Sequence, residues 1–334
     1  MTSRELVYQT LNKENPKRIP RQLWPLPWAK DHYPQRYEQL KQKYPDDIVG
    51  PDSCYIKPPV VKGDMFKVGS YVDEWGCIWE NEQAGIVGQI KDPIIKSWND
   101  LKKIRLPKEL LGVDVESVNA FCKKSDKFVI GGACPRPFER MQFLRGSETL
   151  LMDLALKEEG LFELFDIVHK FNVSELKAWA KTNVDALWFM DDWGSQRALL
   201  ISPQDWRKFY KPLYKEYIDI AHNSGKKAFM HSDGYIFDIF PDLIEIGLDA
   251  INSQIFCMDI KELSKFKGKI TFWGEIDRQQ TLPYGSRQDV VNSVKQVKEH
   301  LYDNGGVIAQ CEFGAEVNPD NVEAVFETWD SFSL

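Results

Sequence analysis

The stretch Lys227–Gly234, which reads Lys-Ala-Phe-Met-His-Ser-Asp-Gly, places polar side chains directly after a short apolar run. A long amphipathic segment, residues 203–223, precedes it, and further helical and apolar segments follow. A strand with a polar tip, followed by a helix and another strand, is the repeating unit of a parallel α/β fold. A strand that needs only to be buried does not require His231, Ser232 and Asp233 at its end. We therefore expect the chemistry of this protein to take place beside His231.

The same pattern repeats along the C-terminal two thirds of the chain. It predicts strands at 127–133, 186–190, 228–231, 250–253, 270–275 and 307–311. It predicts helices at 138–156, 159–181, 203–223 with a kink at Pro212, 288–303, and from Asn318 to Trp329. Together with two earlier units starting near residues 19 and 47, these make eight parallel strands. The predicted fold class is α/β, a single eight-stranded parallel βα (TIM) barrel with an elaborated, loop-rich N-terminal third.

The N-terminal third shows weaker patterns. Residues 2–14 form an apolar stripe behind a Thr2/Glu5 capping box and predict a helix, which is followed by a strand at 19–24. Nine prolines between Pro20 and Pro93 indicate long loops, and 72–81 reads as a strand pair. We expect one domain over 1–334, in which 1–126 holds the elaboration and first strands, and 127–330 holds the clear units. The elaboration should wall one end of the pocket.

Composition excludes several classes of protein. The net charge of −7 and the absence of a basic stripe disfavour a nucleic-acid partner. No apolar run reaches the length that spans a bilayer, and the N-terminus lacks the apolar core of a signal peptide, so we expect a cytoplasmic protein without a membrane partner. The six cysteines have irregular spacings and no Cys-x-x-Cys pair, which is typical of reduced thiols. Phosphate-binding loops, dinucleotide fingerprints and nucleophile elbows are missing from the sequence.

In a βα barrel the active site lies at the carboxyl ends of the strands, and this rule selects the candidate residues. The polar and aromatic residues at the predicted strand ends are Asp191, Asp192, Trp193, His231, Asp233, Asn252, Gln254, Trp273, Glu275, Asp277, Cys311 and Glu312. Strand alternation places His231 and Asp233 on one face of their strand, and Trp273 and Glu275 on one face of another. Asp191, Asp192, Asn252 and Asp277 have an equal claim to a structural role, because Asp and Asn often cap the following helix.

His231, Asp233 and Cys311 together make a plausible zinc site, since zinc accepts nitrogen, sulfur and oxygen ligands. The spacing between His231 and Cys311 is no motif, so their proximity depends on the barrel. The alternative without a metal is a proton relay between His231 and Asp233.

Four segments resemble the uroporphyrinogen decarboxylase superfamily. They are Phe138–Leu154, the His231-Ser-Asp-Gly stretch, the run from Pro241 to Asn252, and Asn318–Val322. The resemblance covers roughly residues 127–330, and it implies a single eight-stranded βα barrel.

The superfamily that the chain resembles has two main branches, and the sequence departs from the motif of each. Uroporphyrinogen decarboxylases carry Arg-Gln-Ala-Gly-Arg-Tyr near the N-terminus, whose arginines hold the carboxylates of the substrate, whereas the stretch here reads Arg21-Gln-Leu-Trp-Pro-Leu-Pro-Trp28. The methyltransferase branch moves methyl groups between corrinoid proteins and small acceptors, and its thiol-activating members bind zinc through His-x-Cys and a later Cys. His231 and Cys311 match that pattern, but Asp233 replaces the middle cysteine. Glu275 or Gln254 would then complete the zinc set.

The preferred hypothesis is a methyltransferase-type member that uses a small-molecule substrate, a corrinoid (cobalamin) cofactor carried by a partner protein and no covalently bound cofactor. His231, Asp233 and Cys311 would activate the acceptor or hold zinc, with Trp193 and Trp273 as apolar walls. The remaining candidates for substrate contacts are Gln254, Asn252 and Glu312.

Two alternatives stay open. In a decarboxylase of uroporphyrinogen or another polycarboxylate, as in porphyrin biosynthesis, Asp191 or Asp192 would steady a protonated pyrrole. Its basic pocket would draw on Arg136, Arg140, Arg197 and Arg278. The second alternative is a binding protein that has lost catalysis. A homodimer is open in every case.

Overall fold

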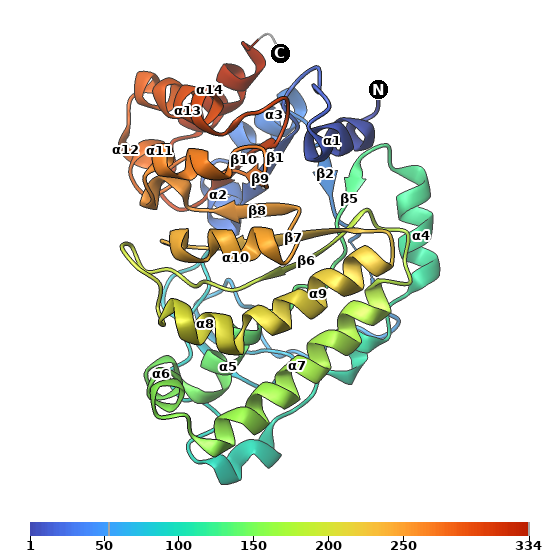
Figure 1. Cartoon of the computed structure of the whole chain (residues 1–334), viewed down its shortest axis with the longest axis vertical. Helices are drawn as coiled ribbons and strands as arrows, with labels where there is room; N and C mark the ends of the chain where they lie inside the picture. Colours follow the sequence, from blue (N-terminus) through green and yellow to red (C-terminus); the bar gives the residue numbers. More distant parts are fainter. Residues whose placement is uncertain (53, 333–334) are drawn as a thin grey trace.

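The computed structural model describes residues 1–52 and 54–332, and its centre is a curled parallel sheet of six strands (Figure 1). The strand order is β1-β10-β9-β8-β7-β6, with every neighbouring pair parallel. The strands are β1 (Arg21–Pro25), β6 (Ala186–Met190), β7 (Lys227–Ser232), β8 (Ala250–Ser253), β9 (Thr271–Trp273) and β10 (Val307–Phe313). All six were predicted, and β1 joins the sheet beside the last strand of the chain.

A separate two-stranded parallel sheet, β2 (Ile48–Val49) with β5 (Phe128–Val129), approaches both edges of the larger one. Ile130 forms a single parallel bridge to Ala186 of β6. On the other side the backbone N–H of Asp47 donates to the carbonyl of Arg21 at 2.9 Å. The prediction of a curled parallel α/β sheet is confirmed, but the continuous ladder contains six strands rather than eight.

Alternation along the strands divides the core into two layers. The inner cluster, on the concave face of the sheet, contains Ile48, Phe128, Ile130, Ala186, Phe229, Ala250, Trp273 and Ile308. The outer cluster lies between the sheet and the helices and includes Leu187, Phe189, Ala228, Met230, Ile251, Phe272 and Ala309. Successive residues of one strand therefore enter different environments.

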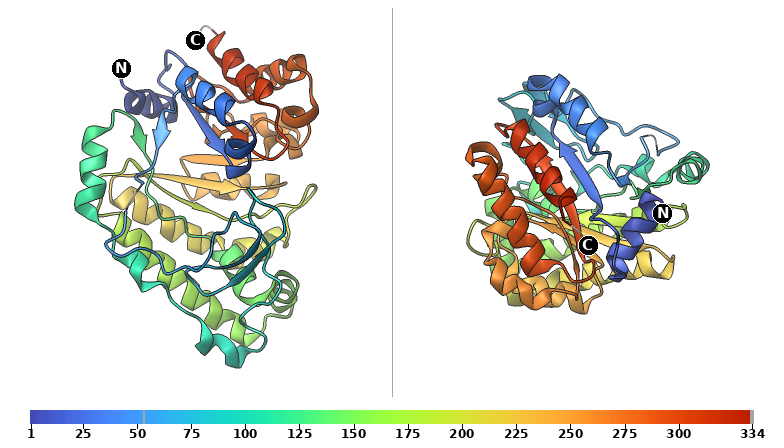
Figure 2. Two further views of the ribbon diagram at one scale, coloured as in Figure 1. Left: turned by 180° about the vertical axis from the view of Figure 1, so that it is seen from behind. Right: turned by 90° about the horizontal axis from the view of Figure 1, so that it is seen from above.

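Helices cover the convex face, with both termini near one end of the molecule (Figures 1 and 2). They are α7 (Glu159–Trp179), α8 (Pro203–Phe209), α9 (Lys211–Asn223), α10 (Phe240–Glu245), α11 (Ile260–Leu263), α12 (Thr281–Tyr284), α13 (Arg287–Leu301) and α14 (Pro319–Asp330). Asn318 caps α14 and Ser286 caps α13, as their side chains accept from backbone N–H groups of the first turns. None of the helices in the described residues has the length and apolarity needed to cross a bilayer.

The N-terminal part combines short elements with long loops. Helix α1 (Ser3–Asn12) carries the predicted Thr2/Glu5 capping box. The predicted strand pair is an antiparallel hairpin of β3 (Gly69–Val72) and β4 (Ile78–Asn81). The other elements are α2 (Pro27–His32), α3 (Pro34–Lys43), the 3-10 helices Trp98–Lys103 and Lys108–Leu111, and α4 (Val115–Lys124).

Two predicted helices are interrupted. The segment 138–156 divides into α5 (Pro137–Arg145) and α6 (Ser147–Leu156), because Gly146 adopts φ 85° between them. The segment 203–223 divides into α8 and α9 one residue before Lys211, so that Pro212 lies in the first turn of a new helix, where its missing N–H costs nothing.

Candidate functional site

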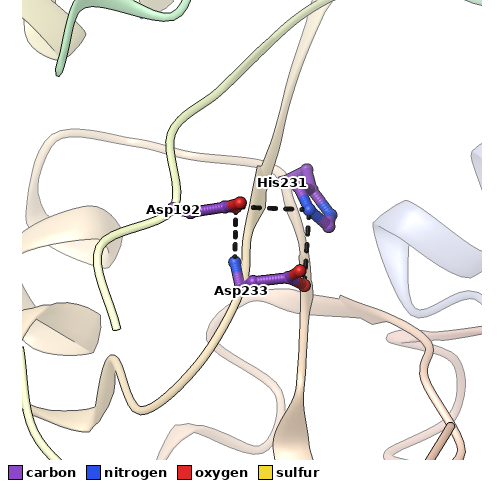
Figure 3. A group of neighbouring side chains, drawn as sticks. All are labelled: Asp192, His231 and Asp233. Carbon is purple, nitrogen blue, oxygen red and sulfur yellow. Dashed lines mark hydrogen bonds and ion pairs between the residues drawn. The ribbon is translucent and has the colours of Figure 1, made fainter. Parts of the chain in front are cut away.

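Three side chains at the carboxyl ends of β6 and β7 form the centre of the site (Figure 3). His231 is 5 % exposed, and its Nε2 lies 3.5 Å from an oxygen of Asp192 and 3.4 Å from Oδ1 of Asp233. The backbone N–H of Asp233 donates to Asp192 Oδ1 at 3.0 Å, which ties the end of β7 to the loop after β6. One ligand atom from each residue lies within 4.8 Å of the others.

Asn252 of β8 determines which nitrogen of His231 carries a proton. Its amide nitrogen donates to the carbonyl of Trp273, so its Oδ1 must face His231 Nδ1, at 2.5 Å. An amide oxygen only accepts, and Nδ1 is therefore the donor in this pair. The lone pair of the neutral imidazole then belongs to Nε2, which faces the two carboxylates.

Arg278 joins three carboxyl groups beside this centre. Its guanidinium contacts Asp233 directly, lies 2.5 Å from Glu312 and lies 3.7 Å from Glu275. Burial raises the pKa of Glu275 and of Glu312. Asp233 gives Arg278 its Oδ2 alone, whereas its buried Oδ1 has no hydrogen-bond partner and points to His231 Nε2.

The residues present fit a divalent metal such as zinc. One imidazole nitrogen and two carboxylate oxygens are ligands that zinc accepts, and the histidine has the supporting hydrogen bond on its other nitrogen that zinc ligands usually show. The partnerless Oδ1 of Asp233 is a buried oxygen that a cation would satisfy. His231, Asp192 and Asp233 are therefore the residues that would hold it.

Next to His231, three tryptophans line a cavity of about 270 Å³. Trp24 of β1 lies with its ring centre 5.6 Å from that of His231 and 5.1 Å from that of Trp273. Trp188 of β6 completes the group at 6.3 Å from each of the other two rings. Trp273, which was predicted as an apolar wall of the substrate pocket, lines this cavity.

Asp191 caps a helix, which is the structural role predicted from the sequence as the alternative to a catalytic one. It is fully buried, and its carboxylate accepts the backbone N–H groups of Phe138 and Glu139 at 2.9 and 2.7 Å, and the hydroxyl of Tyr214 at 2.5 Å. It thus caps the first turn of α5 from a neighbouring strand. Burial raises its pKa.

Two predicted site residues lie on the outer side of the sheet. Trp193 is fully buried, stacks on Phe138 with ring centres 4.2 Å apart, and donates its Nε1–H to Tyr214 at 2.7 Å. Cys311 belongs to the same outer cluster and is absent from the group of metal-ligand atoms in the described part of the chain. Burial raises the pKa of its thiol. Alternation is the reason: Glu312, next to Cys311, takes the inward position and meets Arg278. Asp192 replaces Cys311 in the ligand group.

The other predicted residues lie around the centre. Gln254 accepts the N–H of Gly234 at 2.8 Å and lines a second, polar cavity of about 370 Å³ together with Glu275, Asp277 and Arg278. Asn252 orients His231, as described above.

Trp24, Trp188 and Glu139 were not among the predicted site residues. The sequence could have indicated Trp188, because strand alternation places it on the same face of its strand as Asp192. Glu139, whose pKa burial raises, has a partnerless buried oxygen and lies close enough to His231 and Asp192 to feel their charges. No sequence signal marks it.

Three of the four arginines predicted for a basic pocket are paired with carboxyl groups, whereas Arg197 lines the polar cavity together with Arg278. Arg140 binds Asp73 at 2.7 Å and Glu74 at 3.0 Å. Arg136 lies 3.8 Å from Glu139. With Arg278 held by three carboxyl groups, the surroundings of His231 are acidic, and a substrate with many carboxylates finds little to bind there.

The comparisons with known proteins place this arrangement in a known class of folds. The structure is similar to a methyltransferase from Methanosarcina mazei, with a TM-score of 0.71, 16% identity and coverage of 100% of both chains. At that identity the likeness shows the fold alone. A B12-independent methionine synthase from Shewanella sp. W3-18-1 gives a TM-score of 0.46 at 12% identity, over 90% of this chain and 85% of that one, and carries no argument.

The family model for uroporphyrinogen decarboxylase (URO-D) matches residues 75–332. The protein belongs to this family. The comparison with curated proteins finds no matching sequence.

Proposed function

We propose that this protein is a methyltransferase-type enzyme of the URO-D family, which moves a methyl group between a small molecule and a corrinoid protein or another small acceptor. The observation that carries the proposal is the orientation of His231. Its Nδ1–H is committed to Asn252, and its Nε2 faces Asp192 and a partnerless oxygen of Asp233. This is a ligand set prepared for a metal.

The residues of the chain supply binding and orientation. Asn252 fixes the tautomer of His231, and Arg278 holds Asp233 by one oxygen so that the other stays turned to the site. The cavity lined by the three tryptophans gives an apolar place for the substrate, and Trp24 connects it to His231. A bound zinc ion would supply Lewis-acid chemistry to the group that accepts or loses the methyl. A corrinoid protein would dock over the carboxyl ends of the strands.

The acidic surroundings favour this function over decarboxylation of a polycarboxylate. Asp233, Glu275 and Glu312 share Arg278, which is the single arginine paired with them among the described residues, and Asp192 adds a fourth carboxyl group. The contacts that a many-carboxylate substrate needs are charge-assisted bonds from free arginines.

The test is metal content and methyl transfer measured on the same preparations. Protein purified without added metal or chelator should contain one equivalent of zinc, and His231→Ala and Asp192→Ala should lose it together with methyl transfer from methylated small molecules to a corrinoid protein. Cys311→Ala is the matched control and should keep its metal. Loss of metal in Cys311→Ala, with retention in Asp192→Ala, would contradict the ligand set. Turnover of uroporphyrinogen with release of CO₂ would contradict the function.

A further inference from the structure

The cavity beside His231 has an unusual wall. Among the described residues its lining is Gln22, Trp24, Val49, Gly50, Pro51, Ile130, Gly131, Gly132, Trp188 and Trp273, which includes three tryptophans from three strands. Ring nitrogen Nε1 of Trp273 donates to Gln22 Oε1 at 3.0 Å, which holds that indole in place. The volume of about 270 Å³ suits a small ligand.

The three indole planes stand steeply to one another. Trp24 and Trp273 are perpendicular, at 90°, and Trp188 makes angles of 66° with Trp24 and 69° with Trp273. Three such planes form a corner, which we call the tryptophan corner. A flat ligand can stack on one plane of a corner, whereas a compact, rounded group contacts several planes at once.

The charge around the corner is negative. Trp24 lies against His231, whose Nε2 is flanked by Asp192 and Asp233. Asp233 is paired with Arg278, but His231 is the one ion-pair partner of Asp192 among the described residues. Indole faces attract cations through their quadrupole, and Trp does so best of the aromatic side chains. The indole faces thus select a cationic ligand whether or not Asp192 and Asp233 hold a metal.

We propose that the tryptophan corner binds a methylated ammonium group, as in a quaternary or protonated tertiary amine, and that this amine is the methyl-bearing substrate. Only the second half of this statement rests on the proposed function. Binding of the cation requires the indole faces of the corner, and it needs neither a metal nor a corrinoid partner.

A pair of probes with equal shape and different charge tests the proposal. Choline and its neutral carbon isostere, in which tert-butyl replaces trimethylammonium, are titrated into the full-length protein by calorimetry and tryptophan fluorescence. Choline should bind about tenfold more tightly than the isostere, since cation–π attraction is added to the same apolar contact. Equal affinities, or failure of choline to bind at millimolar concentration, would overturn it. So would a neutral methoxyarene that binds more tightly than choline.

Substitutions separate the charge effect from loss of packing. Trp24→Leu should weaken choline about tenfold and leave the isostere within a factor of about two, whereas Trp24→Phe should retain part of the preference. Trp28→Leu is the matched control, since Trp28 stacks on His32 outside the cavity, and its choline affinity should stay at the wild-type value. If Trp24→Leu lowered the affinity for both probes equally, the corner would act only as an apolar surface without a preference for cations. Choline binding without methyl transfer from any donor would retain the corner and remove the proposed function.

Discussion

Neighbouring residues of one strand have different surroundings on the inner and outer faces of the sheet. At the end of β6, Asp192 faces His231 while Asp191 is buried beneath α5, and Trp188 lines the cavity while Trp193 packs among the helices. At the end of β10, Glu312 meets Arg278 and Cys311 lies in the outer cluster. The inner face thus provides the candidate site and the outer face provides stability. Successive residues of a strand point to opposite faces, so a shift of one residue along the strand exchanges the two roles.

The largest expected difference between the faces concerns the tryptophans of β6. Trp193→Ala should lower the free energy of unfolding by about 4 kcal/mol, because it empties a fully buried indole site stacked on Phe138. Trp188→Ala should cost less than half of that, since Trp188 is only partly buried and borders a cavity. Urea unfolding of both variants measures the difference, and equal losses would show that Trp188 is as structural as Trp193.

The aspartates of the same strand end give the next prediction. Asp191→Ala leaves two backbone N–H groups of α5 and the Tyr214 hydroxyl without their acceptor, which should cost about 3 kcal/mol. Asp192, with a side chain 41% exposed, accepts among the described residues only the backbone N–H of Asp233, so its replacement by alanine in the presence of a chelator should cost at most about 1.5 kcal/mol. A stable Asp191→Ala protein with impaired activity would reverse these roles.

Alternation could have predicted most of this division from the sequence. Ala186, Trp188 and Asp192 share one parity, as do Ile308 and Glu312, and the apolar members of each series identify the inner face. Applied to β7 and β9, the same rule grouped His231 with Asp233 and Trp273 with Glu275, and in the structure Trp273 belongs to the inner cluster. Every polar or aromatic residue at a strand end was selected from the sequence, whichever face of the strand it occupied. For that reason Trp193 and Cys311 were included in the site.

Other features had no local signal. The pairing of Arg140 with Asp73 joins residues 67 positions apart, from α5 and the loop after β3. The positions of the strands, the hairpin and the Thr2/Glu5 capping box follow from short sequence patterns, whereas the partners of a buried charge depend on how distant segments pack. For that reason the N-terminal elaboration was predicted only as a wall of the pocket. Its residues line another cavity, of about 440 Å³, with α5 and α7, and the metal-ligand group is not in that lining.

A smaller effect is expected from Asn252, which acts on the inner face through His231 alone. Asn252→Ala should weaken metal binding about 10- to 100-fold, because the tautomer of His231 is no longer fixed. Asn252→Asp keeps an acceptor for Nδ1–H and should recover part of the affinity. Competition with a chromogenic chelator measures both, and an unchanged affinity in Asn252→Ala would remove Asn252 from the support of the site.

The last prediction concerns Glu175, a buried carboxyl of α7 that lies beyond the outer face. Burial raises its pKa to about 7 in the folded protein, and Tyr55 is its hydrogen-bond partner at 3.4 Å. Between its unfolded pKa, about 4.3, and about 7, the folded state holds the proton and the unfolded state releases it. The contribution of Glu175 to stability is therefore complete below the unfolded pKa and is lost as the pH rises towards 7.

Glu175→Gln removes this titration and keeps the shape of the side chain. From pH 5 to pH 7 the variant should gain about 2 kcal/mol in unfolding free energy relative to the wild type, since each pH unit across the window is worth up to about 1.4 kcal/mol. Urea unfolding at the two pH values measures the gain. Metal content should stay at the wild-type level, because Glu175 lies outside the ligand group. A constant difference between the two proteins would show that the buried carboxyl titrates normally, and a loss of metal would connect the outer layer to the site.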